Sequence, residues 1–269
     1  MIFIKKKGDG FLMLTKKVWT MAIAIPMAVA IGFGGYNVSN NQNHSMAADN
    51  KVPQTILISK DFSLTSSFEE MVNQSDLVVI GEYKNFDSKW NMARDPYNPL
   101  EEDTENYVEG HLYNFKISET IKGTAVSKIV KVNHRYAESF LLEESNAVVA
   151  EDGIILKEAT KVVTKKVENK DPLYIEPTLG KKYMLFLKEG ETLGNYYGAI
   201  EPFSISFDKN NKAELDSNLK TINDDLLTST IQFDGSEYIL KNEIHETITD
   251  TISGRDLKEL KEQVQKKAK

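Results

Sequence analysis

The sequence contains no cysteine among its 269 residues. This absence excludes disulfide bonds, thiolate metal sites and a cysteine nucleophile together. The fold must therefore be stabilised by packing and hydrogen bonding alone. Aliphatic and aromatic residues are plentiful enough to form a buried core, since 41% of the chain is hydrophobic.

Familiar catalytic and nucleotide-binding motifs are also missing. The chain has no His-Glu-x-x-His pair, no Gly-x-Ser-x-Gly elbow, no P-loop and no dinucleotide fingerprint. Ser217 and Lys220 match Ser-x-x-Lys, a spacing in which lysine can activate serine, but the companion motifs of that enzyme class are absent. A match of this length is expected by chance in a lysine-rich chain. The sequence predicts no cofactor and no metal.

Acidic residues outnumber basic ones outside the first thirty residues. Residues 1–30 carry five lysines and one aspartate, so the rest of the chain has a formal charge of −11, against −7 for the whole. A domain this acidic is repelled by nucleic acid and by anionic membranes. Lys128, Lys131 and Arg135 form only a modest basic strip. We therefore expect no nucleic-acid partner.

Residues 1–30 have the organisation of a secretory signal peptide, with a basic, an apolar and a small-residue region in that order. Pro26 ends the apolar run and leaves the following alanines extended for cleavage. The three regions are Lys16 and Lys17, residues 18–25, and the cleavage residues Ala28 and Ala30. The pattern predicts an extracytoplasmic protein, either secreted or attached to the cell surface.

Two alternatives concern this N-terminal segment. Translation can begin at Met13, which would give a more compact signal. The apolar run extended to Gly35 can instead serve as an uncleaved anchor, although Pro26 and several glycines weaken it as a span. Membrane contact is expected only through such an uncleaved segment, and the expected partner is another extracytoplasmic protein.

Beyond the signal, the pattern predicts a flexible tether over 31–54, a β-domain over 55–208 and an extension over 209–269. The tether is rich in asparagine and serine and has no periodicity. The extension ends in an amphipathic helix with a stripe of Leu257, Leu260 and Val264, which we expect to dock on the domain. Ser253 is the predicted N-cap of that helix.

Alternation of apolar and polar residues predicts six or more strands in the central domain. Val130, Val132, His134 and Tyr136 are expected on one strand face. Gly81 is placed for a bend or bulge. The remaining signals are a capping box at 66–69 that opens a short helix, and a hairpin turn at Asp152 and Gly153 that residues 162–167 extend. The prediction is a mainly β protein.

The order of these elements resembles a known family. The matching runs are residues 74–81, 113–117 leading into 121–123, 129–132 and 180–187. They resemble the oligosaccharide/oligonucleotide-binding (OB) type barrel of the netrin module and of the tissue inhibitors of metalloproteases, over residues 66–208. The resemblance implies a five- to six-stranded OB-like barrel with a short early helix, an inserted hairpin and a C-terminal helix. The inhibitors block zinc with an N-terminal cysteine, and this chain has none.

Two long insertions, 87–110 and 138–176, interrupt the family pattern and are the predicted binding loops. The first combines acidic residues with aromatic ones, which favours protein binding, although a solvated loop or a calcium site are alternatives. The candidate protein-binding residues are Trp90, Tyr97, Glu101, Glu102, Asp103 and Tyr107.

Two functional hypotheses follow. The first is an exported, non-enzymatic interaction module, inhibitor-like, that binds its partner through the two insertions. The second is an exported hydrolase with an unfamiliar active site around His134 or Ser217. They differ in one geometric requirement, because a hydrolase needs His134 close to a carboxylate and a nucleophile across an open cleft.

Overall fold

The computed structural model describes residues 53–59, 62–145, 148–149, 155–157, 162–190 and 194–267. The predicted signal peptide with Ala28 and Ala30, the alternative start at Met13 and nearly all of the tether lie outside these residues. No helix within the described ranges is long and apolar enough to cross a membrane.

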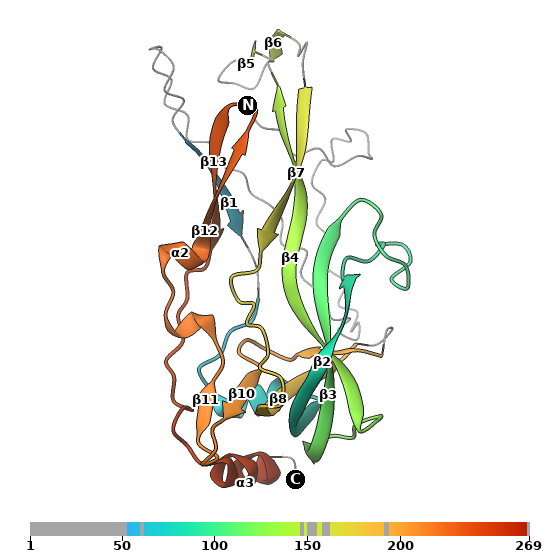
Figure 1. The fold of residues 1–269 in the computed structure, drawn as a ribbon, viewed down its shortest axis with the longest axis vertical. Helices are drawn as coiled ribbons and strands as arrows, with labels where there is room; N and C mark the ends of the chain where they lie inside the picture. Colours follow the sequence, from blue (N-terminus) through green and yellow to red (C-terminus); the bar gives the residue numbers. More distant parts are fainter. Residues whose placement is uncertain are drawn as a thin grey trace, which may run out of the picture.

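The protein is mainly β, with a short early helix and a C-terminal helix, which confirms the predicted fold class (Figure 1). The strands of the large sheet are β2 (Leu77–Asn91), β3 (Tyr107–Lys122), β4 (Ile129–Ser145), β7 (Val162–Lys170), β8 (Lys182–Glu189), β9 (Tyr196–Gly198), β10 (Ser204–Phe207) and β11 (Ala213–Leu215). The remaining strands are β1 (Gln54–Ser59), β5 (Val148–Val149), β6 (Ile155–Lys157), β12 (Thr228–Phe233) and β13 (Ser236–Glu243). The helices are α1 (Phe68–Gln74), η1 (Asn218–Lys220), α2 (Asp224–Leu227) and α3 (Leu257–Lys267).

The large sheet curls on itself through the short strand β9. Its order is β11-β10-β8-β2-β3-β4-β7, and β9 pairs parallel with β4 and antiparallel with β8. The pairings therefore run in a ring from β2 through β3, β4, β9 and β8 back to β2. The inside of this ring is an apolar core that includes Val79, Phe115, Val132 and Leu185.

Gly81 lets β2 bend into this ring, as the sequence predicts. A Cβ atom at Gly81 would lie 2.1 Å from the Lys116 carbonyl oxygen and 2.7 Å from the Phe115 ring. The register between β2 and β3 shifts between Ile80 and Gly81. Such an irregularity bends the strand and increases its twist, and glycine permits the close approach.

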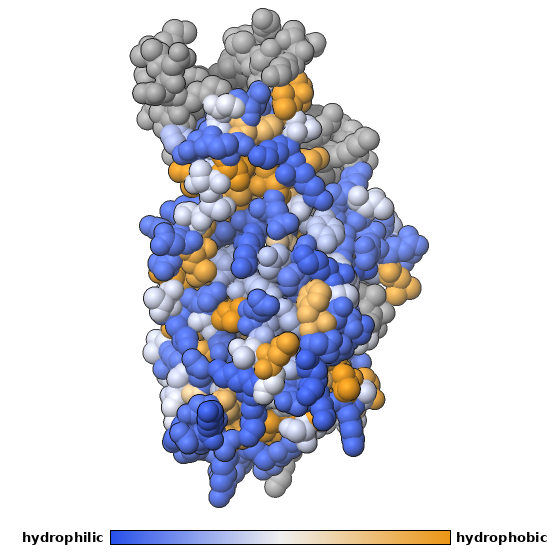
Figure 2. Space-filling model, in the orientation of Figure 1, coloured by the Kyte–Doolittle hydropathy of each residue, from blue (hydrophilic) through white to orange (hydrophobic). Residues whose placement is uncertain are grey.

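A second sheet, β1-β13-β12, lies beside the far ends of β4 and β7 (Figure 1). Strand β1 joins it by parallel pairing with β13, from Gln54 opposite Tyr238 to Ser59 opposite Glu243. A separate core that includes Ile58, Leu142, Val167 and Leu240 fills the space between the two sheets. Hydrophobic residues gather in this upper part of an otherwise mostly hydrophilic face (Figure 2).

Helices α1 and α3 cover the opposite end of the large sheet (Figure 1). Phe68 and Met71 of α1 share one core with Leu260 and Val264 of α3. Ser67 caps α1 by accepting a hydrogen bond from Glu70 N–H at 3.3 Å, close to the predicted capping box.

The predicted N-cap of the last helix is wrong. Helix α3 begins at Leu257, and Leu260 N–H donates to the Asp256 carbonyl. Ser253 lies a few residues earlier, where its hydroxyl accepts from Leu215 N–H at 2.9 Å and donates to Asp250 at 2.6 Å. Gly254, with φ of 86°, makes the turn between that contact and the helix.

The two insertions contain more strand than the sequence indicates. Strand β2 continues to Asn91 and β3 begins at Tyr107, so only residues 92–106 of the first insertion form a loop. Strand β7 pairs with the extended part of β4, from Ala137 opposite Lys170 to Ser145 opposite Val162, and does not extend the β5–β6 hairpin. That hairpin pairs Val148 with Lys157, and its turn at 152–153 lies outside the described residues.

The chain on either side of residue 208 belongs to one sheet. Strands β10 and β11 pair antiparallel across this position, with Phe207 opposite Ala213. Later, α3 contacts the barrel strand β3 through an ion pair between Lys261 and Glu119 at 2.6 Å. The C-terminal segment thus contacts the central sheet through β11 and α3, while its strands β12 and β13 belong to the second sheet.

Candidate functional site

A pocket of about 210 Å³ opens where the barrel strands meet the two insertions. Strand β4 contributes Asn133, His134, Arg135 and Glu138, and the second insertion contributes a segment that runs from Asp171 to Pro177. Met92 comes from the first insertion. The structure therefore brings both insertions to one site.

Aromatic side chains form much of the pocket wall. They are Phe62, Tyr83, Tyr174, Tyr183, Tyr197 and Phe203. Tyr83 lies at the centre of this set and makes edge contacts with Tyr183, with ring centroids 5.1 Å apart, and with Phe115 of the barrel core at 4.9 Å. The wall is thus a continuation of the apolar core.

His134 lies in this aromatic wall, as the alternation of β4 predicts. Its Nε2 atom is 3.0 Å from the Tyr83 hydroxyl, and its ring packs against Tyr113, Tyr174 and Phe203. Burial, assisted by nearby His111, lowers the pKa of His134 to about 3. The imidazole is therefore neutral at physiological pH and is a weak base.

Glu201 is the pocket residue whose carboxyl group has the fewest stabilising contacts within the described ranges. Its backbone is fixed by Glu201 N–H donating to the Ser63 carbonyl at 3.0 Å and by Thr65 N–H donating to the Glu201 carbonyl at 2.9 Å. Within the described ranges, its carboxyl group has no hydrogen-bond or ion-pair partner. Burial, reinforced by the negative charge of Asp171, raises its pKa to about 8.

Arg135 is held between two carboxylates of the pocket. Its Nη2 atom lies 2.7 Å from Glu138, and its Nε atom lies 3.3 Å from Asp171. Asp171 also accepts a hydrogen bond from Leu173 N–H at 2.9 Å. The one guanidinium charge is therefore already shared by two acids and cannot neutralise Glu201 as well.

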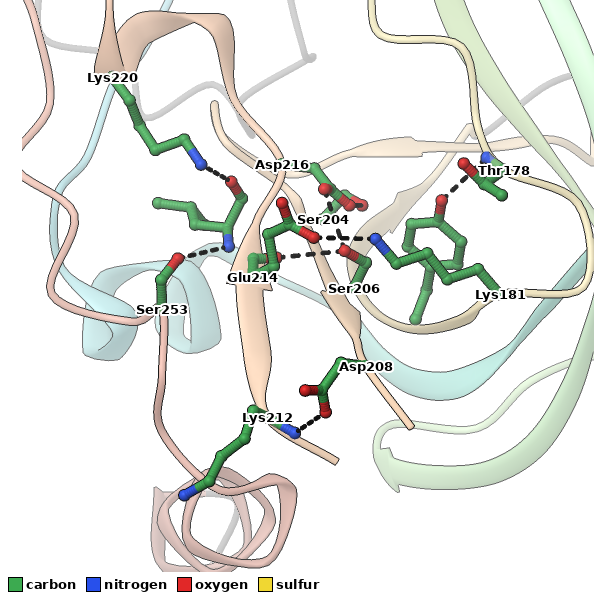
Figure 3. Close-up of polar contacts among 12 residues, drawn as sticks. Thr178, Lys181, Ser204, Ser206, Asp208, Lys212, Glu214, Asp216, Lys220 and Ser253 are labelled. Atoms are coloured by element: carbon green, nitrogen blue, oxygen red, sulfur yellow. Dashed lines mark hydrogen bonds and ion pairs between the residues drawn. The ribbon is translucent and has the colours of Figure 1, made fainter. Parts of the chain in front are cut away.

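Asp216 forms another acidic edge of the pocket. Its carboxylate accepts hydrogen bonds from Ser206 at 3.1 Å and from Ser204 at 3.4 Å (Figure 3). Burial raises its pKa despite these hydrogen bonds. Lys181, whose charge also acts on Asp216, pairs with Glu214 at 2.9 Å (Figure 3).

A buried chain of hydrogen bonds positions Tyr174 behind the pocket. Glu109 accepts from His111 Nε2 at 2.8 Å, and His111 Nδ1 lies 3.2 Å from the Tyr174 hydroxyl. The Tyr174 and Tyr113 hydroxyls are 2.8 Å apart. Burial raises the pKa of Tyr174, so its hydroxyl stays protonated and cannot act as an oxyanion nucleophile.

The predicted protein-binding residues of the first insertion do not form one exposed surface. Trp90 folds back, with Nε1 donating to Asn133 at 2.7 Å and Arg94 stacked 4.7 Å from its ring. Tyr107 lies beneath Lys166 at 5.0 Å. Tyr97, in contrast, is 92% exposed.

The acidic residues of that insertion serve its local structure. Asp103 accepts hydrogen bonds from Glu105 N–H and Asn106 N–H at 2.8 and 3.0 Å. Glu102 lies 4.0 Å from Arg94, and Glu101 is exposed. In the part of the chain that the structure describes, no three acidic or histidine side chains converge to hold a metal ion.

Ser217 is not brought to His134. Its hydroxyl accepts from Leu219 N–H at 3.2 Å and caps η1. Lys220, its predicted activator, donates to the Leu215 carbonyl and lies 3.8 Å from Asp250. Among the described residues, the contacts of His134 include neither a carboxylate nor a serine.

Glu201 and Asp216 were not among the residues that the sequence singled out. Glu201 is the one charged residue in the run from Gly198 to Ile205. A single acid in an otherwise uncharged run is the feature by which the sequence could have indicated it. Asp216 gives no comparable signal, because it lies in a polar stretch. Comparisons of this chain with protein-family models, with curated proteins and with solved structures found no match.

Proposed function

We propose that this chain is a non-enzymatic interaction module that works outside the cytoplasm and binds its partner by taking one projecting group into the pocket. The observation that carries the proposal is the composition of the pocket, an aromatic wall around the carboxyl group of Glu201, which both insertions help to enclose. The export signal supports the location.

The size of the pocket supports a projecting group over a large free ligand. Sites for drug-sized molecules measure roughly 300–1,000 Å³. A volume of about 210 Å³ is suited to one side chain or a headgroup of similar size. A partner protein that inserts one side chain would make its remaining contacts with the rim formed by the insertions.

The ring of five paired strands supports the proposed likeness to OB-type barrels. Such barrels are five-stranded and partly open, and they bind ligands with one face and the adjoining loops. Here the pocket lies where β4 and β8 of the ring meet the loop after β7. The hydrolase alternative has less support, because His134 is a weak base without a carboxylate or nucleophile beside it.

The proposal is tested by filling the pocket. Ile175 lines it and is partly exposed, so Ile175→Trp can occupy the space without replacing a core side chain. Leu179→Trp, at an exposed position outside the pocket, is the matched control. Cross-linking in intact cells, followed by mass spectrometry, should recover a partner with the parent and with L179W but not with I175W. Equal recovery with I175W would contradict the proposal.

A further inference from the structure

We propose that the group taken up by the pocket is an alkylammonium, such as the side chain of a lysine on the partner protein, and that it binds against Glu201. This inference rests on the proposed function and specifies the chemistry of the same site.

The charges that face Glu201 favour a cation. On β4 they are Arg135, Glu138 and the neutral His134, and on the adjoining segments they are Asp171 and Asp216. Lys181 pairs with Glu214, and burial raises the pKa values of Tyr83, Tyr174 and Tyr183, which stay protonated. Among the described residues that line the pocket there are thus four carboxyl groups and one guanidinium, so an anionic ligand would add to an excess of negative charge.

Glu201 offers hydrogen-bond acceptors that no group of the described residues occupies. Even a partly buried carboxylate without a partner is costly, which is why this one holds a proton near neutral pH. An ammonium group beside it would stabilise the ionised form by charge and by hydrogen bonds. Binding would therefore release a proton, and the bound pair would be neutral overall.

The aromatic wall suits the rest of such a ligand. The faces of Tyr and Phe rings attract cations, and their apolar surface accommodates methylene groups. A quaternary ammonium has no N–H to donate and would use only the rings. The free oxygens of Glu201 thus favour a primary ammonium over a quaternary one.

The test measures binding of butylamine to the mature-length protein by calorimetry, with butanol, butyrate and tetramethylammonium as matched probes. We expect saturable binding of butylamine and weaker binding of the other three. The affinity should rise about tenfold per pH unit up to pH 8 and then level off, since butylamine stays protonated while Glu201 ionises. Heats measured in buffers of different ionisation enthalpy should report release of a proton.

Glu201→Gln keeps the shape and the hydrogen-bonding groups of the protonated acid but cannot ionise. It should weaken butylamine binding by about tenfold to a hundredfold and abolish its pH dependence. Glu176→Gln, at an exposed position beside the pocket, should change neither. Circular dichroism and the near-ultraviolet signal of the tyrosines check that both variants fold.

Several outcomes would overturn the ammonium proposal. They are equal binding of butylamine by E201Q and the parent, equal binding of butanol, and preferred binding of tetramethylammonium. After any of these outcomes, the proposed function would still be supported if the I175W variant does not recover the partner. If none of the probes binds and I175W keeps its partner, both proposals fail.

Discussion

On β4, Val130 and Val132 point into the apolar core of the barrel, whereas His134, two residues further along the same face, lines the pocket. The barrel core is filled with aliphatic and aromatic side chains that are almost fully buried. The pocket continues the same strands and part of the same aromatic cluster, yet it holds a carboxyl group without a partner. Packing therefore stabilises the first region, and the second retains an electrostatic cost that a ligand can relieve.

Among the substitutions that compare the core with the pocket, truncation of a core side chain is expected to have the largest effect on stability. Phe115 is fully buried on β3, so Phe115→Ala should lower the free energy of unfolding by about 3–5 kcal/mol through lost burial and a residual cavity. Ile129→Ala, at a half-exposed position of β4, should change it by less than about 1 kcal/mol. Urea denaturation measures both changes, and the slope of the unfolding free energy against urea concentration should be the same in the two variants and the parent. Similar losses in the two variants would contradict the assignment of the core.

Glu201→Gln should act in the opposite direction and stabilise the protein. The pKa of Glu201 is raised on folding, so its contribution to stability is complete below its unfolded pKa near 4.5 and is lost as the pH rises through about 8. The free energy of unfolding of the variant should therefore exceed that of the parent by roughly 2–4 kcal/mol at pH 9 and by little at pH 4.5. Denaturation midpoints at both pH values test this, and a constant difference would contradict the shifted pKa.

His134 should impose the opposite pH dependence. Its pKa is lowered on folding, so its contribution is complete above its unfolded pKa of about 6.5 and is lost as the pH falls through about 3. Together with Glu201, this predicts a plateau of stability between about pH 4.5 and 6.5, with a decline on either side. In His134→Phe the decline on the acid side should become shallower. Thermal denaturation across the pH range, with the exposed His245→Phe as a control, measures this.

Removing single polar contacts should have smaller effects. Tyr83→Phe deletes the hydroxyl that bonds to His134 Nε2 and should cost about 1 kcal/mol, while Tyr97→Phe, at a 92% exposed ring, should cost nothing measurable. Glu119→Gln breaks the partly exposed ion pair with Lys261 of α3 and should cost less than about 0.5 kcal/mol. A larger loss for E119Q than for Y83F would reverse the expected order.

Local patterns were sufficient to predict much of the fold. The alternation on β4, the bend at Gly81 and the short early helix depend on neighbours in the sequence, and the structure has all three. The N-cap of that helix, Ser67, lies one residue after the one that the capping box at 66–69 predicted. Strand pairing at a distance was not predicted. Strand β1 pairs with β13, and β7 with the end of β4, because each covers an apolar core that no local pattern specifies.

Of the parts that form the pocket, only His134 and the two insertions were identified from the sequence. Its most unusual group, Glu201, becomes notable because Asp171 lies near it and because Arg135 is already shared between other acids. These relations come from tertiary contacts between segments that are far apart in the sequence. The contacts of the aromatic residues of the first insertion could not be predicted for the same reason, since Trp90 donates a hydrogen bond to Asn133 on β4.

The most direct test of the central claim, that the pocket holds an uncompensated carboxyl ready for a cation, is a carbon-13 NMR titration of the Glu201 carboxyl with and without butylamine. Comparison with E201Q assigns the signal. We predict a midpoint near pH 8 in the free protein that moves to lower pH when butylamine is added. A midpoint near the ordinary glutamate value of about 4.3, unchanged by butylamine, would contradict the account.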